Sequence, residues 1–433
     1  MRIIRADDTG FEEAFQKIKN RGWFNEDIWK QTKIIVEDVR SRKDDALFGY
    51  TKKFDRWMPT ADTIEITFRE MKNAAALVKA EELAILKLSA KRVAKFHRKQ
   101  VARSWLFSDE AGIALGQRIT PLERVGIYAP GGLASYPSTV IMAAIPARIA
   151  GVPEIFLVTP AKDGQLNPLI ITAAKLSGVT RIFKVGGAQA VAALANGTES
   201  IPRVDKIVGP GNAYVTAAKM MVYQWCLCGI DMAAGPSEIL IIADRAANAS
   251  YVAADLLAQA EHDEMASAIL LTPNEALATK VAYEVAAQLN GLQRKTIAER
   301  AIRDFGAIIV TKNIAEAAAI ANQFAPEHLE LMVKNPEKLI SKIKHAGAVF
   351  LGHSTPETLG DYMAGPNHIL PTGGTARFSS PLGVYDFVKR SNILSFSKES
   401  LQKYGKRAAG FAEMEGLEAH GKSITVRISP KKP

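Results

Sequence analysis

The sequence predicts an α/β protein with two lobes, each built on a parallel sheet that helices cover on both faces. From Arg124 onward, short β-branched strands alternate with helices, and a second alternating series begins after Pro236. Strands of this kind are buried on both faces when they belong to parallel sheets. Two such series in one chain therefore favour two lobes with a cleft between them.

The segment before the first series, residues 1–120, is expected to be mostly helical. Apolar residues recur at helical spacing over 11–18, 29–39 and 71–94, and a short extended piece at 63–68 interrupts them. No Gly- or Ser-rich linker separates this segment from the strands that follow.

Each alternating series contains four strands with helices between them. In the first series the predicted strands are 125–130, 154–159, 181–185 and 206–208, and the helices are 137–150, 169–176, 188–195 and 212–223. In the second series the strands are 238–243, 268–272, 307–311 and 348–351, and the helices are 251–261, 275–289, 314–324 and 336–344. The last part of the chain is expected to be helical with a strand-like end at 423–428, as an appendage without its own core.

Composition excludes several classes of protein. Hydrophobic residues make up 48% of the 433 residues, which excludes bulk disorder. The two cysteines, Cys226 and Cys228, have the spacing of neither a redox pair nor a zinc finger, and a reducing cytoplasm is the expected compartment. No apolar run approaches the ~20 residues that span a bilayer, so no membrane partner and no secretory signal are expected.

The formal net charge of +10 prompts the hypothesis of a nucleic-acid partner. Residues 1–104 hold 23 Lys or Arg against 16 Asp or Glu, and residues 381–433 hold 10 against 5, so the long middle region is slightly acidic. The densest run, 87–103, places lysines four apart on one helix face, which is typical of a solvated surface. We expect no nucleic-acid binding, because the positive charge lies at the two ends of the chain.

A glycine-rich turn follows the last strand of the first series. Gly209, Pro210, Gly211 and Asn212 lead into a helix, and the free N–H groups at a helix N-terminus favour phosphate. The full dinucleotide pattern is absent because position 214 is Tyr, so a tight structural turn is equally consistent with these residues.

Two short segments carry side chains suited to metal binding or proton transfer. Gln259 and His262 lie three apart at a helix end, where a metal pair competes with an ordinary packed helix end. Glu327 and His328 place a carboxylate beside an imidazole at the start of a strand, which suits acid/base work. The same dipeptide would also occur if Glu327 were an ordinary surface residue and His328 a structural one.

Two further segments lie nearer the C-terminus. The run 360–386 contains Asp361 and His368 among many turn residues, and a long polar loop of this kind is usually functional or disordered. The apolar residues spaced through it favour order. Glu415 and His420 in the appendage would be ordinary surface residues if they stood alone.

Taken together, these segments resemble the histidinol dehydrogenase family over essentially the whole chain. The most specific stretches are GIDMAAGPSE at 229–238, QAEH at 259–262, FAPEHLEL at 324–331, the polar run 360–386 and EGLEAH at 415–420. Five matching segments in one order are more specific than any one of them.

The resemblance implies an enzyme that oxidises L-histidinol to L-histidine through L-histidinal, with two hydride transfers to NAD, as the last steps of histidine biosynthesis. It implies His328 as the general base and Glu327 as the group that activates water in the second step. One Zn²⁺ per subunit would be held by Gln259, His262, Asp361 and His420. The implied substrate contacts are Ser237, Gln259, His262, His328, Asp361, His368, Glu415 and His420, and the implied NAD contacts are Tyr128, Gln189 and Asn212.

The same resemblance implies two Rossmann-like lobes of the aldehyde-dehydrogenase-like kind and a homodimer whose C-terminal segment completes the partner's site. The expected domains are an N-terminal helical extension at 1–25, a catalytic and metal-binding lobe at 26–127 and 237–380, an NAD-binding lobe at 128–236, and a C-terminal extension at 381–433. Two alternatives stay open: an NAD-dependent dehydrogenase of another small polar alcohol, and a zinc hydrolase that uses Glu327 to activate water.

Overall fold

The computed structural model describes residues 1–21, 25–110, 112–131, 136–233 and 235–428. The chain divides into two compact units. The first unit contains residues 1–100 and 122–387, and the second contains residues 101–121 and 388–433. Two parallel sheets lie in the first unit, which confirms the predicted class of two α/β lobes with parallel sheets.

The first parallel sheet has five strands in the order β6-β5-β4-β7-β8. Its strands are β4 (Arg124–Tyr128), β5 (Glu154–Val158), β6 (Arg181–Phe183), β7 (Lys206–Val208) and β8 (Gly229–Ile230). Most of the apolar residues that cover it come from the helices α2 (Glu26–Asp55), α4 (Ala80–His97), α5 (Pro137–Ala150), α6 (Pro168–Ser177), α7 (Gly187–Asn196) and α8 (Ala213–Gln224). One face packs on α4, α5 and α6, and the other packs on α2, α7 and α8.

The second parallel sheet has six strands in the order β1-β11-β10-β9-β12-β13. Its strands are β1 (Arg2–Arg5), β9 (Glu238–Ala243), β10 (Ser267–Thr272), β11 (Gly306–Val310), β12 (His328–Met332) and β13 (Ala348–Leu351). One face packs on α9 (Ala249–Ala260), α10 (Glu275–Leu289) and α11 (Lys295–Phe305). The other packs mainly on α1 (Phe11–Lys19) and α12 (Ile314–Phe324), with α13 (Pro336–Leu339) at its margin.

The N-terminal third of the chain differs from the helical expectation. Residues Arg2–Arg5 form β1, which pairs in parallel with β11. The extended piece predicted at 63–68 contributes only an isolated bridge at Glu65, and a short helix, α3 (Phe68–Asn73), begins at its last residue. Helices α2 and α4 pack on the five-stranded sheet, whereas the predicted domains grouped residues 26–127 with the other lobe. The domain boundaries stay a prediction.

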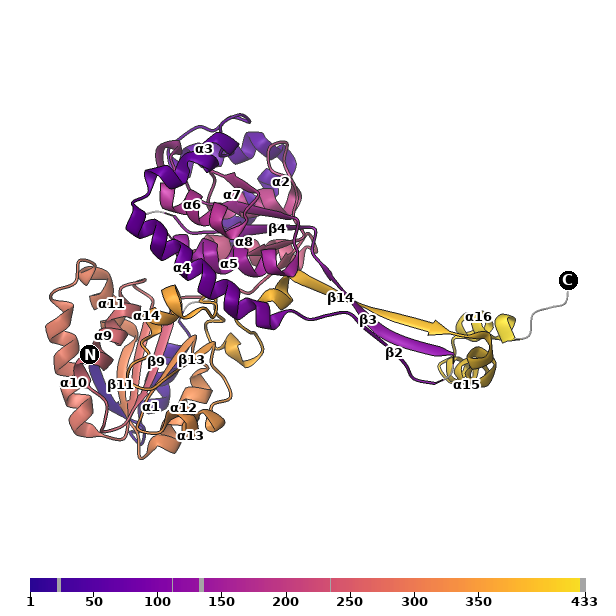
Figure 1. Cartoon of the computed structure of the whole chain (residues 1–433). Helices are drawn as coiled ribbons and strands as arrows, with labels where there is room; N and C mark the ends of the chain where they lie inside the picture. Colours follow the sequence, from indigo (N-terminus) through magenta and orange to yellow (C-terminus); the bar gives the residue numbers. More distant parts are fainter. Residues whose placement is uncertain (22–24, 111, 132–135, 234, 429–433) are drawn as a thin grey trace. The chain divides into compact units, whose positions relative to one another are not determined.

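The second unit is built on a three-stranded antiparallel sheet that the sequence patterns did not indicate. Its order is β14-β3-β2, from β2 (Trp105–Ser108), β3 (Ile113–Pro121) and β14 (Val388–Phe396), and Figure 1 shows the three strands side by side. Two helices follow, α15 (Lys398–Met414) and α16 (Glu418–Ile428).

The strand predicted at 423–428 is wrong, because these residues belong to α16. Ile424 and Ile428 lie four residues apart, on one helix face, and both contact the position where Gly405 of α15 lacks a side chain. This packing outweighs the strand propensity of the β-branched residues.

Two expectations about the surface can be compared with the structure. The lysines spaced four apart, Lys87, Lys91, Lys95 and Lys99, are all exposed, as a solvated helix face requires. Within the part of the chain that the structure describes, none of the helices combines the length and apolarity needed to cross a bilayer.

Candidate active site

A small cavity of about 60 Å³ in the first unit collects residues from several predicted motifs. Ser237, Glu327 and His368 line it, and so do Gly209 and Pro210 of the glycine-rich turn. Segments of both alternating series and of the polar run therefore meet at one place. A cavity with convergent polar groups is where a small-molecule site is expected.

Glu327 and His328 are positioned by the pairing of β12 with β9. His328 is the first residue of β12, and both side chains are buried. The Glu327 carboxylate accepts a hydrogen bond from the backbone N–H of Glu238 at 2.9 Å. Burial raises the pKa of the Glu327 carboxyl well above its usual value. Burial therefore disfavours the charged form of this carboxyl group.

The hydrogen bonding of His328 fixes which ring nitrogen can act as a base. Its Nδ1 lies 3.0 Å from the backbone carbonyl oxygen of Glu238, and a carbonyl only accepts, so Nδ1 carries the hydrogen. Burial lowers the pKa of His328 to about 4, so the ring is neutral at pH 7. Nε2 then holds a free lone pair, and it has no hydrogen-bond partner among the described residues.

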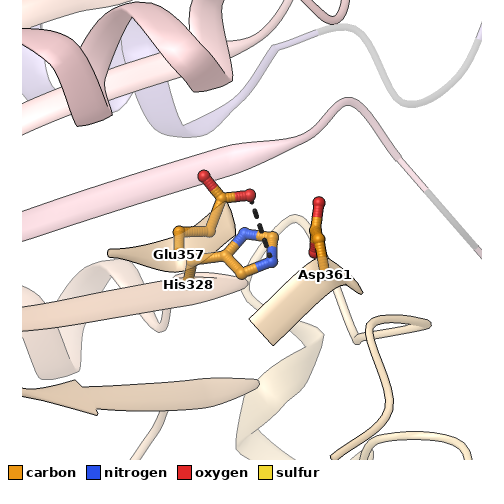
Figure 2. A group of neighbouring side chains, drawn as sticks. All are labelled: His328, Glu357 and Asp361. Carbon is orange, nitrogen blue, oxygen red and sulfur yellow. Dashed lines mark ion pairs between the residues drawn. The ribbon is translucent and has the colours of Figure 1, made fainter. Parts of the chain in front are cut away.

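Nε2 of His328 faces two carboxylates. Glu357 Oε1 lies 3.7 Å from it, and one ligand atom each of His328, Glu357 and Asp361 lies within 4.8 Å of the others. Figure 2 shows the imidazole directed toward both carboxylates, which come from α14 (Glu357–Leu359) and the π-helical turn that follows it. Burial raises the pKa of Glu357. A nitrogen and two carboxylates in this arrangement could hold a cation.

Gln259 and His262 lie at the end of α9, as predicted, but in different surroundings. Gln259 is buried, and its Oε1 is unpaired within the described ranges. His262 follows the helix and is exposed, yet it lies close enough to His328 and His368 to lower the pKa of each. Three of the four predicted metal ligands, Gln259, His262 and Asp361, therefore belong to the unit that contains the cavity.

His368 is held beside Asp361 by a local contact. Its Nδ1 lies 3.0 Å from the Asp361 backbone carbonyl, and its Nε2 lies 3.5 Å from the Thr139 hydroxyl. Burial lowers the pKa of His368, so this ring is also neutral at pH 7. A neutral imidazole at the cavity wall can exchange hydrogen bonds with a polar ligand.

The glycine-rich turn is fixed by a buried ion pair. Lys219 donates to the carbonyl of Gly209 at 2.9 Å and to Asp231, while Asp231 accepts from the N–H of Gly209 at 2.7 Å. Gly209 has φ +109°, and a Cβ there would lie 2.1 Å from the carbonyl oxygen of Tyr128. Only glycine fits this close approach of backbone to backbone.

The three predicted NAD contacts lie at the carboxyl ends of strands of the five-stranded sheet. Tyr128 ends β4, and its hydroxyl accepts from the N–H of Gly187 at 3.0 Å. Gln189 is buried in the first turn of α7, with both amide atoms unpaired among the residues that the structure describes. Asn212 is the N-cap of α8, where its oxygen accepts from two backbone N–H groups.

Glu415 and His420 belong to the second unit. Glu415 caps α15 at its C-terminal end, His420 lies in α16, and both are exposed. Their role as substrate and metal contacts stays a prediction.

Two residues near the site were missed by reasoning from the sequence. Glu357 precedes Asp361 by four residues, a spacing that places two carboxylates on one helix face and could have identified it. Glu238 enters the sequence analysis only as the last residue of the stretch 229–238, although it contacts both Glu327 and His328. These contacts exist because β9 and β12 are paired in the sheet. The two strands are far apart in the sequence, so the spacing of neighbouring residues does not indicate the contacts.

Comparison with known proteins places these observations in a family. A family model described as histidinol dehydrogenase matches residues 19–428. A histidinol dehydrogenase of Geobacter sulfurreducens is 54% identical over 430 residues, 99% of this chain and 100% of that protein. One of Aquifex aeolicus is 49% identical over 99% of each chain. The crystal structure of histidinol dehydrogenase from Elizabethkingia anophelis matches with a TM-score of 0.93 at 40% identity, over 99% of this chain and 98% of that one.

Proposed function

This chain belongs to the histidinol dehydrogenase family, and from that membership we propose that it oxidises L-histidinol to L-histidine through L-histidinal, using NAD and zinc. The observation that carries the proposal is the neutral, buried His328, whose Nδ1 lies 3.6 Å from the Glu327 carboxylate and whose Nε2 is unpaired among the described residues. A neutral imidazole with a free lone pair is what removal of an alcohol proton requires.

The donor atoms present fit a zinc ion. Gln259 Oε1 is buried and unpaired among the described residues, and His262 and Asp361 offer the nitrogen and carboxylate oxygen that zinc accepts. We propose Gln259, His262 and Asp361 as ligands, with His420 as the fourth. When bound, the ion supplies an anchor for the imidazole and amino nitrogens of histidinol and a charge that favours the alkoxide.

The residues at the ends of β4 and β7 fit NAD. The unpaired amide of Gln189, the Tyr128 hydroxyl and the amide of Asn212 offer hydrogen bonds beside a glycine turn that a nucleotide can approach closely. When bound, NAD accepts the hydride in each of the two oxidations.

Within this scheme the chain's own residues handle the protons. His328 Nε2 takes the hydroxyl proton of histidinol as the C–H hydride leaves. Glu327 then takes one proton from the water that adds to the aldehyde carbon, and His328, having released its first proton, takes the hydroxyl proton of the hydrate as the second hydride leaves to give the carboxylate. Ser237 and His368, at the wall of the cavity, orient the substrate, with Glu415 as a further contact.

We propose that the protein acts as a homodimer in which the second unit completes the partner's site with Glu415 and His420. The second unit supports this by its exposed apolar side chains, which include Leu106 and Leu394 at 62% and 68% exposure. Apolar surface of this kind favours an intermolecular contact. A cytoplasmic location is proposed with it, because both cysteines are free thiols.

The decisive experiment compares His328→Asn with Glu327→Gln on histidinol and on histidinal separately, following NADH formation. We expect His328→Asn to slow both oxidations by roughly 10²- to 10⁴-fold, and Glu327→Gln to slow mainly the second. No NADH from fully zinc-loaded wild-type protein would reject the dehydrogenase. Hydrolysis without NAD would favour the zinc hydrolase, and a better turnover of another amino alcohol would favour the related dehydrogenase.

A metal assay separates two ligand sets that share Asp361. If zinc is held by Gln259 and His262, then His328→Asn and Glu357→Gln retain full zinc content and Gln259→Ala loses it. If zinc is held by His328, Glu357 and Asp361, then His328→Asn and Glu357→Gln lose zinc and Gln259→Ala retains it. That outcome would remove His328 from the role of base, because a metal would occupy its lone pair.

A further inference from the structure

Glu238, the first residue of β9, contacts the proposed acid/base pair in three places. Its backbone N–H donates to Glu327 Oε2 at 2.9 Å, and its own carboxylate accepts from the N–H of Glu327 at 3.3 Å. Its backbone carbonyl accepts from Nδ1 of His328 at 3.0 Å. One residue thus orients the Glu327 carboxylate and fixes the tautomer of His328.

The Glu238 carboxylate is itself held by Arg21, which comes from the segment after α1. Arg21 Nη2 donates to Glu238 Oε1 at 2.8 Å, and the two side chains are 2% and 1% exposed. Arg21 is fixed by a second bond, from Nη1 to the carbonyl of Ile18 at 3.1 Å, and its guanidinium lies over the ring of Phe305. The ion pair is therefore rigid at both ends.

Glu238 also reaches the polar run at 360–386. Its carboxylate accepts from the N–H of Gly373, and the neighbouring Thr372 hydroxyl accepts from the N–H of Gly235 at 2.6 Å. Thr372 and Gly235 line the cavity. The same carboxylate thus ties together β12, β9 and a wall of the cavity.

Stability alone gives little reason for a charged pair in this position. Taking two charges out of water is costly, and apolar residues of similar volume often serve a core equally well or better. The hydrogen bonds of Arg21 and Glu238 lead to Glu327 and His328, the two residues proposed to transfer protons. Such a network can fix the geometry of that pair. We infer that Glu238 and Arg21 are positioning residues for the Glu327–His328 pair, an inference that rests on the proposed function.

The inference predicts an effect on turnover without a matching effect on binding. Loss of the Arg21 contact frees the Glu238 carboxylate to move, and Glu327 and His328 move with it. Misplacement of reacting groups by about 1 Å can cost roughly 10²-fold in rate. Substrate and NAD are bound mainly by other residues, so their KM values should change little.

The test measures kcat, both KM values, zinc content and thermal melting for Arg21→Met, Arg21→Lys and Glu238→Gln. We expect Arg21→Met and Glu238→Gln to lower kcat by roughly 10- to 100-fold in both oxidations, with KM within about 3-fold and zinc content unchanged. Arg21→Lys should recover much of the rate that Arg21→Met loses. The Arg21→Met/Glu238→Gln double variant should be no slower than Glu238→Gln alone, because both changes break the same contact. Glu238→Gln keeps the shape of the side chain, so it remains informative if Arg21→Met does not fold.

Arg181→Met is the control, because it breaks the partly buried Arg181–Glu65 ion pair, whose residues do not line the cavity. A kcat loss no greater than in this control, or a parallel change in KM and zinc content, would overturn the inference. The variants His328→Asn and Glu327→Gln separate the positioning role of Arg21 and Glu238 from the proposed function of the Glu327–His328 pair. If His328→Asn and Glu327→Gln lose activity while Arg21→Met and Glu238→Gln do not, only the positioning role fails. If His328→Asn itself remains active, the proposed function of the pair fails.

Discussion

The strands β12 and β14 differ in how the chain covers them. All five residues of β12 are buried, whereas in β14 only the first residue is partly covered and the other eight are exposed. The first unit buries its own strands under helices, while the second unit leaves Leu394 and Phe396 at 68% and 49% exposure. The first unit thus covers its central strands with its own helices, whereas the second unit leaves apolar side chains exposed, which is the kind of surface that an intermolecular contact uses.

The same contrast extends to charged groups. In the first unit, Lys219 and Asp231 are 2% and 1% exposed and are paired with each other. In the second unit, Lys403 and Glu110 also form an ion pair, but they are 60% and 44% exposed. A buried pair must be complete to be tolerated, whereas an exposed pair contributes little.

The largest effect is expected from breaking the buried pair. Lys219→Met leaves the Asp231 carboxylate without its cation and should cost about 3–5 kcal/mol of the free energy of unfolding, measured by urea denaturation. Lys206→Met is the control, since the Lys206–Asp386 pair is 16% and 22% exposed and should cost less. If the two variants lost the same free energy of unfolding, complete burial would not make a broken ion pair more costly than partial burial does.

A smaller effect is expected in the second unit, and it should depend on protein concentration. Leu394→Asp places a charge on the exposed sheet and should raise the dissociation constant of the proposed dimer by roughly 10- to 100-fold, or about 1.4–2.8 kcal/mol. Sedimentation over a range of concentrations measures it. The control is Tyr283→Ser, which alters an exposed aromatic residue of the first unit. A dimer that tolerates Leu394→Asp would place the intermolecular contact elsewhere.

The smallest effect concerns Asp55, a half-buried acid of the first unit. Burial raises its pKa to about 6, above its usual value of 3.8. Its stabilising contribution is therefore full below pH ~4 and is lost as the pH rises through 6. Asp55→Asn should flatten the stability profile between these values and gain about 1 kcal/mol at pH 7, allowing for solvent screening. An unchanged profile would mean that the carboxylate is well solvated.

Much of the fold could be predicted from sequence because the central strands are short, apolar and regularly spaced. Strand β1 could not, since its four residues, RIIR, carry two charges and pair with a strand three hundred positions later in the chain. The antiparallel sheet was also missed, because strands exposed on both faces have no buried face to create an alternating pattern.

The candidate site was predicted unevenly. Glu327, His328 and the glycine turn could be chosen from residue chemistry and position, with alternatives left open. Ser237, Gln189 and Tyr128 came only through resemblance, because a serine, an amide and a phenol are common in any fold. Glu357 has a local signal in its spacing from Asp361, but its position beside His328 and the Arg21–Glu238 pair depend on which strands become neighbours, and the packing of the whole sheet decides this.

Strand β1 has a practical consequence for anyone who shortens this protein. It covers one edge of β11, a run of five buried residues, GAIIV, with no charge and no proline. Deletion of the first residues would turn this run into an open sheet edge, which is a template for self-association into fibrils or amorphous aggregate. Trimming the N-terminus for crystallisation or display would therefore reduce solubility.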